Sequence, residues 1–222
     1  MSKEAKGNSA ENFRIIEAVE SKIDGVIVRQ LIAHEDKRGS LAEIMKLVPE
    51  WNELFNETYP LAMNYASITM PGEMRDVDQW HHHDESLPSG GQEDRFVVFL
   101  GETILALYDD RENSPTHGKL EIIKLQGADW KTGRWEEKHP VMVLVPKGVK
   151  HCVANFSEKP CLHINFPTKI YDAIKEKEYK PWLEGRVNFN DVPIKSLGGR
   201  FFNWDLVKEL LKNDPQNRKR KR

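Results

Sequence analysis

The sequence predicts an all-β protein, a jelly-roll β-barrel of antiparallel strands with short helices mainly near the C-terminus. From residue 25 onward, short apolar and β-branched runs recur at intervals of roughly 8–20 residues, with Gly and Pro between them. These runs alternate with turn signals and not with long helical patterns, which favours a barrel or sandwich over a parallel α/β sheet. Closure into a barrel would leave few of the strands with exposed edges.

The expected strands can be justified in chain order. Val26–Val28 opens the first β-branched run, the turn at 37–40 follows, and the apolar run 41–45 completes a predicted hairpin. Pro71-Gly72 marks a later turn. The remaining predicted strands are 64–70, 96–100, 103–108, 120–125, 141–145, 152–156 and 162–166.

The character of the chain changes on both sides of this β-rich region. We expect residues 1–24 to form an N-terminal arm with a weakly helical stretch at 12–21, residues 25–170 to form the barrel, and the loop at 49–60 to cover part of it. Residues 171–212 are expected to form a C-terminal helical segment, with helices at 170–179 and 204–211. A basic tail, 213–222, then follows and reads as a solubilising segment.

The composition excludes several classes of protein. The 222 residues suit one domain, and a net charge of −2 gives no general reason to expect a nucleic-acid partner. The sequence contains no apolar run long enough to span a membrane and no signal-peptide pattern at its start, so we expect a cytoplasmic protein. The two cysteines, Cys152 and Cys161, form no C-x-x-C pattern and are expected to be small buried apolar residues.

One histidine-bearing segment spans residues 145–155 and has the form P-x-G-x-x-H-x-x-x-N. Pro146 and Gly148 shape a turn, and His151 opens the next strand, where it can point into the barrel. This spacing is similar to the second sequence motif of cupins, which are jelly-roll barrels. It therefore favours a cupin-type barrel with a pocket inside it.

A second segment contains three consecutive histidines. Strand alternation places His81 and His83 on one face and the histidine between them on the other. The two could bind a metal ion together with His151 and a carboxylate from Glu93 or Asp94, as in the first cupin motif. In a metal-free site, one histidine could instead act as a general base, because its pKa suits neutral pH.

A more specific resemblance covers roughly residues 25–170. The segment 25–43 contains a D-x-R-G turn, and the segment 109–119 has the form D-x-R-x-x-S-P-T-x-G. Together with P-x-G-x-x-H at 146–151, these motifs resemble, in the same order, those of dTDP-4-dehydrorhamnose 3,5-epimerases, which are RmlC-like cupins. The resemblance implies an epimerase or isomerase that acts on a nucleotide-linked 4-keto sugar without a cofactor, and a homodimer.

The resemblance also suggests site residues. It favours His81 as the base that removes the proton next to the carbonyl group, with His83 as the second choice. A lysine of the family would fall near Asp94 or Arg95, its tyrosine acid near His163, and its C-terminal aspartate has no counterpart after residue 170. The residues expected to bind the substrate, including three arginines for a diphosphate, are Arg38, Glu43, Arg75, Arg95, His151 and His163.

Two alternatives remain open at this point. A metal-dependent cupin, either a dioxygenase or an isomerase, would hold a divalent transition metal with His81, His83, Glu93 and His151. A non-catalytic cupin would bind a sugar or nucleotide in the same pocket. The residues alone support all three interpretations, and the family resemblance favours the metal-free epimerase.

Overall fold

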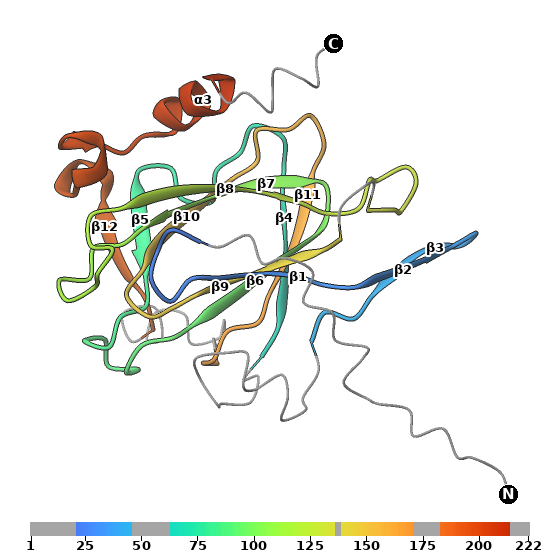
Figure 1. Cartoon of the computed structure of the whole chain (residues 1–222), viewed down its shortest axis with the longest axis horizontal. Coiled ribbons are helices and arrows are strands. Elements are labelled where there is room, and N and C mark those ends of the chain that lie inside the picture. The colour runs from blue at the N-terminus through green and yellow to red at the C-terminus, as the bar shows by residue number, and fades with distance from the viewer. Residues whose placement is uncertain (1–20, 46–62, 136–138, 171–182, 214–222) are drawn as a thin grey trace, which may run out of the picture.

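The structure, a computed structural model, describes residues 21–45, 63–135, 139–170 and 183–213. Two five-stranded antiparallel sheets face each other (Figure 1). The first has the order β1 (Ile27–Gln30), β9 (Val141–Val145), β6 (Asp94–Leu100), β11 (Cys161–Asn165) and β4 (Tyr65–Thr69). The second has the order β12 (Gly185–Asn188), β5 (Gln79–His82), β10 (Lys150–Ala154), β7 (Glu102–Tyr108) and β8 (Leu120–Gln126). The predicted all-β, jelly-roll class is confirmed.

A hairpin forms around the predicted turn at 37–40, but the apolar run that begins at residue 26 is not its first strand, because β1 pairs with β9 instead. The strands of the hairpin are β2 (Ala33–Asp36) and β3 (Gly39–Ala42), and it extends away from the barrel in Figure 1. The C-terminal part contains β13 (Pro193–Ile194), β14 (Arg200–Phe201), two single 3₁₀ turns (Phe189–Asp191 and Lys195–Leu197) and the predicted helix, α3 (Trp204–Asn213). The predictions for 1–20, 49–60, 171–179 and 214–222 fall outside the described residues.

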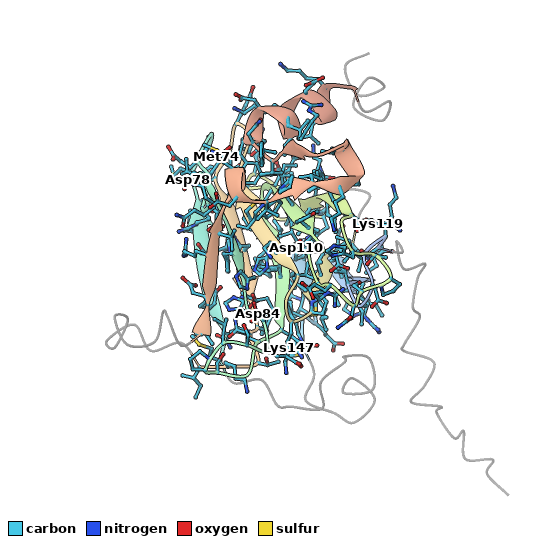
Figure 2. The ribbon with its side chains drawn as sticks, turned by 90° about the vertical axis from the view of Figure 1, so that its left-hand side faces the viewer. Met74, Asp78, Asp84, Asp110, Lys119 and Lys147 are labelled. Carbon is cyan, nitrogen blue, oxygen red and sulfur yellow. The ribbon has the colours of Figure 1, made fainter. Side chains whose placement is uncertain are left out.

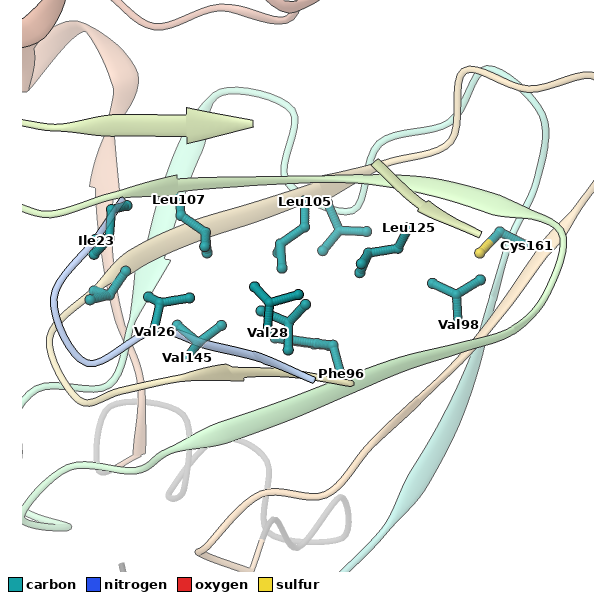
Figure 3. Packing of buried hydrophobic residues seen from close by; sticks show 13 residues of the cluster. Ile23, Val26, Val28, Phe96, Val98, Leu105, Leu107, Leu125, Val145 and Cys161 are labelled. Atoms are coloured by element: carbon teal, nitrogen blue, oxygen red, sulfur yellow. The ribbon is translucent and has the colours of Figure 1, made fainter. Parts of the chain in front are cut away.

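The space between the two sheets is filled by apolar side chains. Leu105 and Leu107 of β7 meet Phe96 and Val98 of β6 there, as Figure 3 shows. All four side chains are at most 5% exposed. Because successive side chains of a strand point to opposite faces, this packing also fixes which residues of each strand point inward.

A second apolar cluster lies on the outer face of the second sheet. Ile104 and Tyr108, the alternate residues of β7, pack there with Trp80 of β5 beneath Phe202 and Trp204 of the C-terminal segment. The rings of Trp80 and Phe202 lie 4.4 Å apart, centroid to centroid. The second sheet is therefore covered on both faces, which explains why β7 is apolar at nearly every position.

The segment after residue 170 is part of this sheet. Strand β12 pairs with β5 over four residues, from Gly185 opposite His82 to Asn188 opposite Gln79. Within the described ranges, no helix has the length and apolarity needed to cross a membrane. Cys152 and Cys161 are both buried and unpaired with each other, and burial raises the pKa of each thiol.

Candidate active site

The histidines meet at the centre of the second sheet. His81 on β5 lies directly opposite His151 on β10, and their rings are 4.1 Å apart, centroid to centroid. His83 follows the end of β5 on the same face, and its ring is 5.1 Å from that of His81. His82 points the other way, where its Nδ1 lies 2.7 Å from Asp84. The alternation expected from the sequence is confirmed.

The run that contains β5 passes from Asp78 to Asp84, and Figure 2 shows Asp84 close to Lys147 at one end of the barrel. The inward face of this run borders a cavity of about 600 Å³. Residues of both sheets and of the segment that precedes β12 line it: Met63, Tyr65, Ser67, Arg75, Asp76, His81, His83, Gln92, Phe96, Val153, His163, Pro167, Leu183, Glu184 and Arg186. A cavity of this size can admit a small organic ligand.

A carboxylate from the opposite sheet completes the histidine cluster. Asp94, the first residue of β6, places Oδ2 3.2 Å from Nε2 of His83 and 3.3 Å from Nε2 of His151. One ligand atom from each of His81, His83, Asp94 and His151 can be chosen so that all four lie within 4.8 Å of one another. The side chains of His83, Asp94 and His151 are at most 5% exposed.

Hydrogen bonds hold His83, His151 and Asp94 each in one orientation. The Nδ1 atoms of His83 and His151 lie 2.7 Å and 3.0 Å from the backbone oxygens of Leu183 and Val149. The other oxygen of Asp94, Oδ1, accepts hydrogen bonds from the side-chain amides of Gln92, at 2.9 Å, and Asn165, at 2.8 Å. Both Nε2 atoms and Oδ2 therefore face the same point.

Asp76 is a site residue that the sequence analysis missed. Its Oδ2 lies 3.6 Å from Nδ1 of His81, and its other oxygen lies 3.4 Å from the guanidinium of Arg186 on β12. The indole N–H of Trp204 donates to the backbone oxygen of Asp76 at 2.7 Å. The C-terminal segment thus holds a buried carboxylate beside Nδ1 of His81.

The protonation states follow from burial and these contacts. Burial lowers the pKa of His81, the nearby His151 lowers it further, and Asp76 opposes the shift. Burial alone would lower the pKa of His83 and raise that of Asp94, but their attraction outweighs it: the pKa of His83 is raised and that of Asp94 is held well below its usual range. His81 is therefore neutral near pH 7, and Asp94 is ionised.

The opposite wall of the cavity carries a second set of polar groups. The hydroxyl of Tyr65 on β4 accepts a hydrogen bond of 2.9 Å from the amide of Asn165, which also contacts Asp94. Burial is the main cause of a raised pKa for Tyr65, so the phenol keeps its proton at neutral pH. Burial, with a smaller effect of Arg75, lowers the pKa of His163 to about 4, so this imidazole is neutral.

The structure separates the predicted site residues into two groups. His81, His83, His163 and Arg75 line the cavity, and His151 belongs to the histidine cluster. Arg75 donates to the backbone oxygen of Ile68 at 2.5 Å and to the hydroxyl of Thr69 at 3.1 Å, which orients its guanidinium.

The other predicted residues do not line this cavity in their own chain. Arg38 pairs with Asp36 on the extended hairpin, and Glu43 is an exposed residue just after it. Arg95 is buried, 3.4 Å from Glu93, and donates to the backbone oxygen of Phe166. Within its own chain, none of these three residues lines the cavity beside the histidines, so their part in substrate binding stays a prediction.

Of Glu93 and Asp94, the two carboxylates considered as a metal ligand, the structure brings Asp94 to the histidines. Along β6, Asp94, Phe96 and Val98 are alternate residues, and their side chains all point between the two sheets. Asp94, and not Glu93, therefore faces the histidines. The side chain of Glu93 instead borders a different hollow of about 770 Å³, near Arg111.

The known proteins with similar sequences are named for glycan or polysaccharide biosynthesis. No protein-family model matches the chain. It is 35% identical over 150 residues to the probable low-salt glycan biosynthesis epimerase Agl13 of Haloferax volcanii, a match that covers 68% of this chain and 81% of Agl13. It is 29% identical over 169 residues to the spore coat polysaccharide biosynthesis protein SpsL of Bacillus subtilis, covering 76% of this chain and 95% of SpsL.

Solved structures with the same fold are more distant in sequence. The dTDP-4-dehydrorhamnose 3,5-epimerase of Elizabethkingia anophelis is 20% identical with a TM-score of 0.57, over 78% of this chain and 81% of that one. RmlC of Legionella pneumophila, solved with dTDP-4-keto-L-rhamnose, is 20% identical with a TM-score of 0.60, over 79% of each chain. These structures agree with the jelly-roll architecture described above.

Proposed function

Since the chain belongs to the RmlC-like family of carbohydrate epimerases related to dTDP-4-dehydrorhamnose 3,5-epimerase, we propose that it epimerises a nucleotide-linked 4-keto sugar with His81 as its base. A carbonyl group acidifies the C–H bond beside it, so a neutral imidazole can remove that proton. The observation that carries this proposal is the position of His81, neutral and on the cavity wall, with the carboxylate of Asp76 3.6 Å behind its Nδ1.

Asp76 has a defined part in this scheme. When His81 takes a proton, its ring becomes positively charged inside a buried site, and the negative charge of Asp76 stabilises it there. The carboxylate also favours the tautomer in which Nδ1 carries the hydrogen, leaving Nε2 free to accept the proton of the substrate. Asp76 thus serves as a positioning residue for the base.

Tyr65 is our candidate for the acid that returns a proton to the other face of the sugar. Among the described residues that line the cavity, Tyr65 is the tyrosine, and it lies on β4 of the opposite sheet. Its phenol retains its proton, because its pKa is raised, and Asn165 fixes the hydroxyl through a hydrogen bond. An acid and a base from facing sheets would flank a sugar ring bound between them.

The test uses a panel of nucleotide-linked 4-keto sugars incubated with the protein in deuterated water. We expect deuterium to enter at the carbon next to the carbonyl, with inversion at that carbon followed by NMR. His81→Ala should abolish both, whereas Tyr65→Phe should slow inversion more than exchange, because proton removal would still occur. His82→Ala is the matched control, since His82 adjoins the base but points out of the cavity.

Two results would contradict the proposal. Exchange that survives His81→Ala at the rate of the wild type would remove His81 as the base. Ligand binding by the wild type with no exchange for any sugar of the panel would favour the non-catalytic sugar-binding alternative.

We also infer that the working form is a homodimer. Arg38 lies in the turn of the β2–β3 hairpin, and Glu43 directly follows it. The hairpin extends away from its own barrel (Figure 1), so in this chain alone the two residues cannot reach the cavity. If the hairpin docks on a second copy, the two residues can help to bind the nucleotide diphosphate there. Light scattering should then give twice the mass of one chain, and Arg38→Ala should raise KM with little change in kcat. A monomer with full activity would refute this inference.

A further inference from the structure

We propose that His83, Asp94 and His151 bind one divalent transition-metal ion, and that His81 is left free beside it. The contacts of the two imidazole rings fix which of their nitrogens carry hydrogen. A backbone oxygen can only accept a hydrogen bond, so Nδ1 of His83 and Nδ1 of His151 must carry hydrogen toward Leu183 and Val149. In each neutral ring, Nε2 then carries a lone pair.

Those two lone pairs face a third. Oδ2 of Asp94 lies 3.2 Å from Nε2 of His83 and 3.3 Å from Nε2 of His151, and an ionised carboxylate oxygen is an acceptor as well. If one of the two Nε2 atoms is protonated, it can donate to Oδ2 of Asp94, but the other Nε2 and Oδ2 still face each other as two acceptors. Two protons would place two imidazolium rings against one buried carboxylate. A single cation at the shared point satisfies all three atoms.

The separations suit coordination. Ligand atoms about 2.1 Å from an ion are about 3.0–3.4 Å apart when their bond angles lie between octahedral and tetrahedral values. The two measured separations fall within this interval. Nε2 of His151 is buried and, among the described residues, has no hydrogen bond of acceptable geometry, as a nitrogen reserved for a metal would.

The surroundings also match those of bound metals. Histidine ligands commonly donate their second N–H to a carbonyl or carboxylate, and carboxylate ligands are themselves hydrogen-bonded. Both features are present, because backbone oxygens fix the two rings and two amides fix Oδ1 of Asp94. The amide nitrogen of Gln92 lies 3.3 Å from Nε2 of His83, and an ion bound to that lone pair would replace this longer contact while the 2.9 Å bond from the amide to Oδ1 of Asp94 remains.

Two imidazoles and one carboxylate leave open positions on the ion, and this ligand set suits Fe²⁺, Mn²⁺, Co²⁺, Ni²⁺ or Zn²⁺. A bound ion would supply positive charge near the carbonyl oxygen of the substrate, where negative charge develops during proton removal. That use rests on the proposed function, but the binding of the ion does not.

The test measures metal binding by the full chain without a histidine tag. After treatment with a chelator and dialysis, the protein is titrated with CoCl₂ or ZnCl₂ by calorimetry, and cobalt coordination is followed in its visible absorption. We expect one tight site, with affinity at least about 100-fold weaker in Asp94→Asn and His151→Ala. His82→Ala should bind as the wild type does, and His81→Ala should still bind one ion.

A second readout guards against a variant that misfolds. The ion should raise the melting temperature of the wild type by an amount that grows with the logarithm of its concentration, and this shift should vanish in Asp94→Asn even if that variant is folded. Failure of the wild type to bind any ion while deuterium exchange proceeds in chelator would overturn the metal site and leave the epimerase intact. Loss of the ion in His81→Ala would overturn the separate role of His81. A bound ion without exchange would overturn the epimerase and leave the metal site standing.

Discussion

Asp76→Asn should reduce catalysis without removing the base. The perturbation replaces a charged oxygen 3.6 Å from Nδ1 of His81 with a neutral amide of nearly the same shape. With an effective dielectric constant of about 20, two unit charges at this separation attract by about 4.6 kcal/mol. Arg186, 3.4 Å from the other oxygen of Asp76, already neutralises part of that charge. We therefore expect a loss of about 2–4 kcal/mol in the stabilisation of protonated His81.

This loss corresponds to a fall in kcat of between about 30-fold and about 1,000-fold, at about 1.4 kcal/mol for each factor of ten. The assay is the initial rate of deuterium incorporation at saturating substrate, measured below the melting temperature of each variant. Asp78→Asn is the control, because Asp78 is two residues away and exposed, and it should keep the rate of the wild type. A rate for Asp76→Asn within threefold of the wild type would refute the reasoning that Asp76 stabilises the charged base.

Three further predictions concern stability. Asp109 is held by Arg111, Ser114 and Thr116, which outweigh the effect of burial and lower its pKa to about 2. Because the pKa is depressed in the folded state, the ionised carboxylate stabilises the fold above pH 4, and this stabilisation is lost between about pH 4 and pH 2. Asp109→Asn should therefore cost about 2 kcal/mol in urea unfolding at pH 7 and far less at pH 2.5, and an equal loss at both pH values would contradict this. Gly101→Ala should lower the free energy of unfolding by more than about 2 kcal/mol, because its backbone φ is 77° and a Cβ would overlap the Pro160 oxygen. Gly198→Ala is the control, since φ is 67° but the space around it is open, and it should cost about 1 kcal/mol. Similar losses for the two variants would show that the structure relieves the overlap at little cost. Leu107→Ala, in the core, should lower the free energy of unfolding by about 2–5 kcal/mol in the same assay. Leu41→Ala, at an exposed position, should lower it by less than about 0.5 kcal/mol. A small loss for Leu107→Ala would mean that the core collapses around the gap.

The sequence predicted the strands of the barrel because most of them are apolar and separated by Gly or Pro. Strand β5 was harder to place as an element, because Gln-Trp-His-His has only one residue with a strong β preference. Strand β12 was missed, since its four residues, Gly-Arg-Val-Asn, have no alternating pattern and pair with a strand about a hundred residues earlier. Such distant pairing leaves no local signal in either segment.

Within the site, alternation along β5 correctly placed His81 and His83, but the choice between Glu93 and Asp94 depended on the phase of β6. That strand is apolar on both faces, so its sequence does not show which residues point inward; only the packing of Phe96 and Val98 does. Asp76 was missed for another reason. It precedes β5 in an irregular segment, where no periodicity predicts the direction of a side chain, and Arg186 and Trp204 that hold it come from the C-terminal part.

The pairing of β5 has a consequence for synthesis on the ribosome. On one side this strand meets β10 at a single residue pair, His81 with His151, whereas on the other it meets β12 at four. Its register is therefore set chiefly by residues 185–188, which leave the ribosome after the rest of the two sheets. Because translation proceeds from the N-terminus and delivers residues one after another, the two sheets can begin to close around their apolar interior while the histidine strand still lacks its main partner. A nascent chain stalled before β12 emerges would have a nearly complete barrel without a finished pocket.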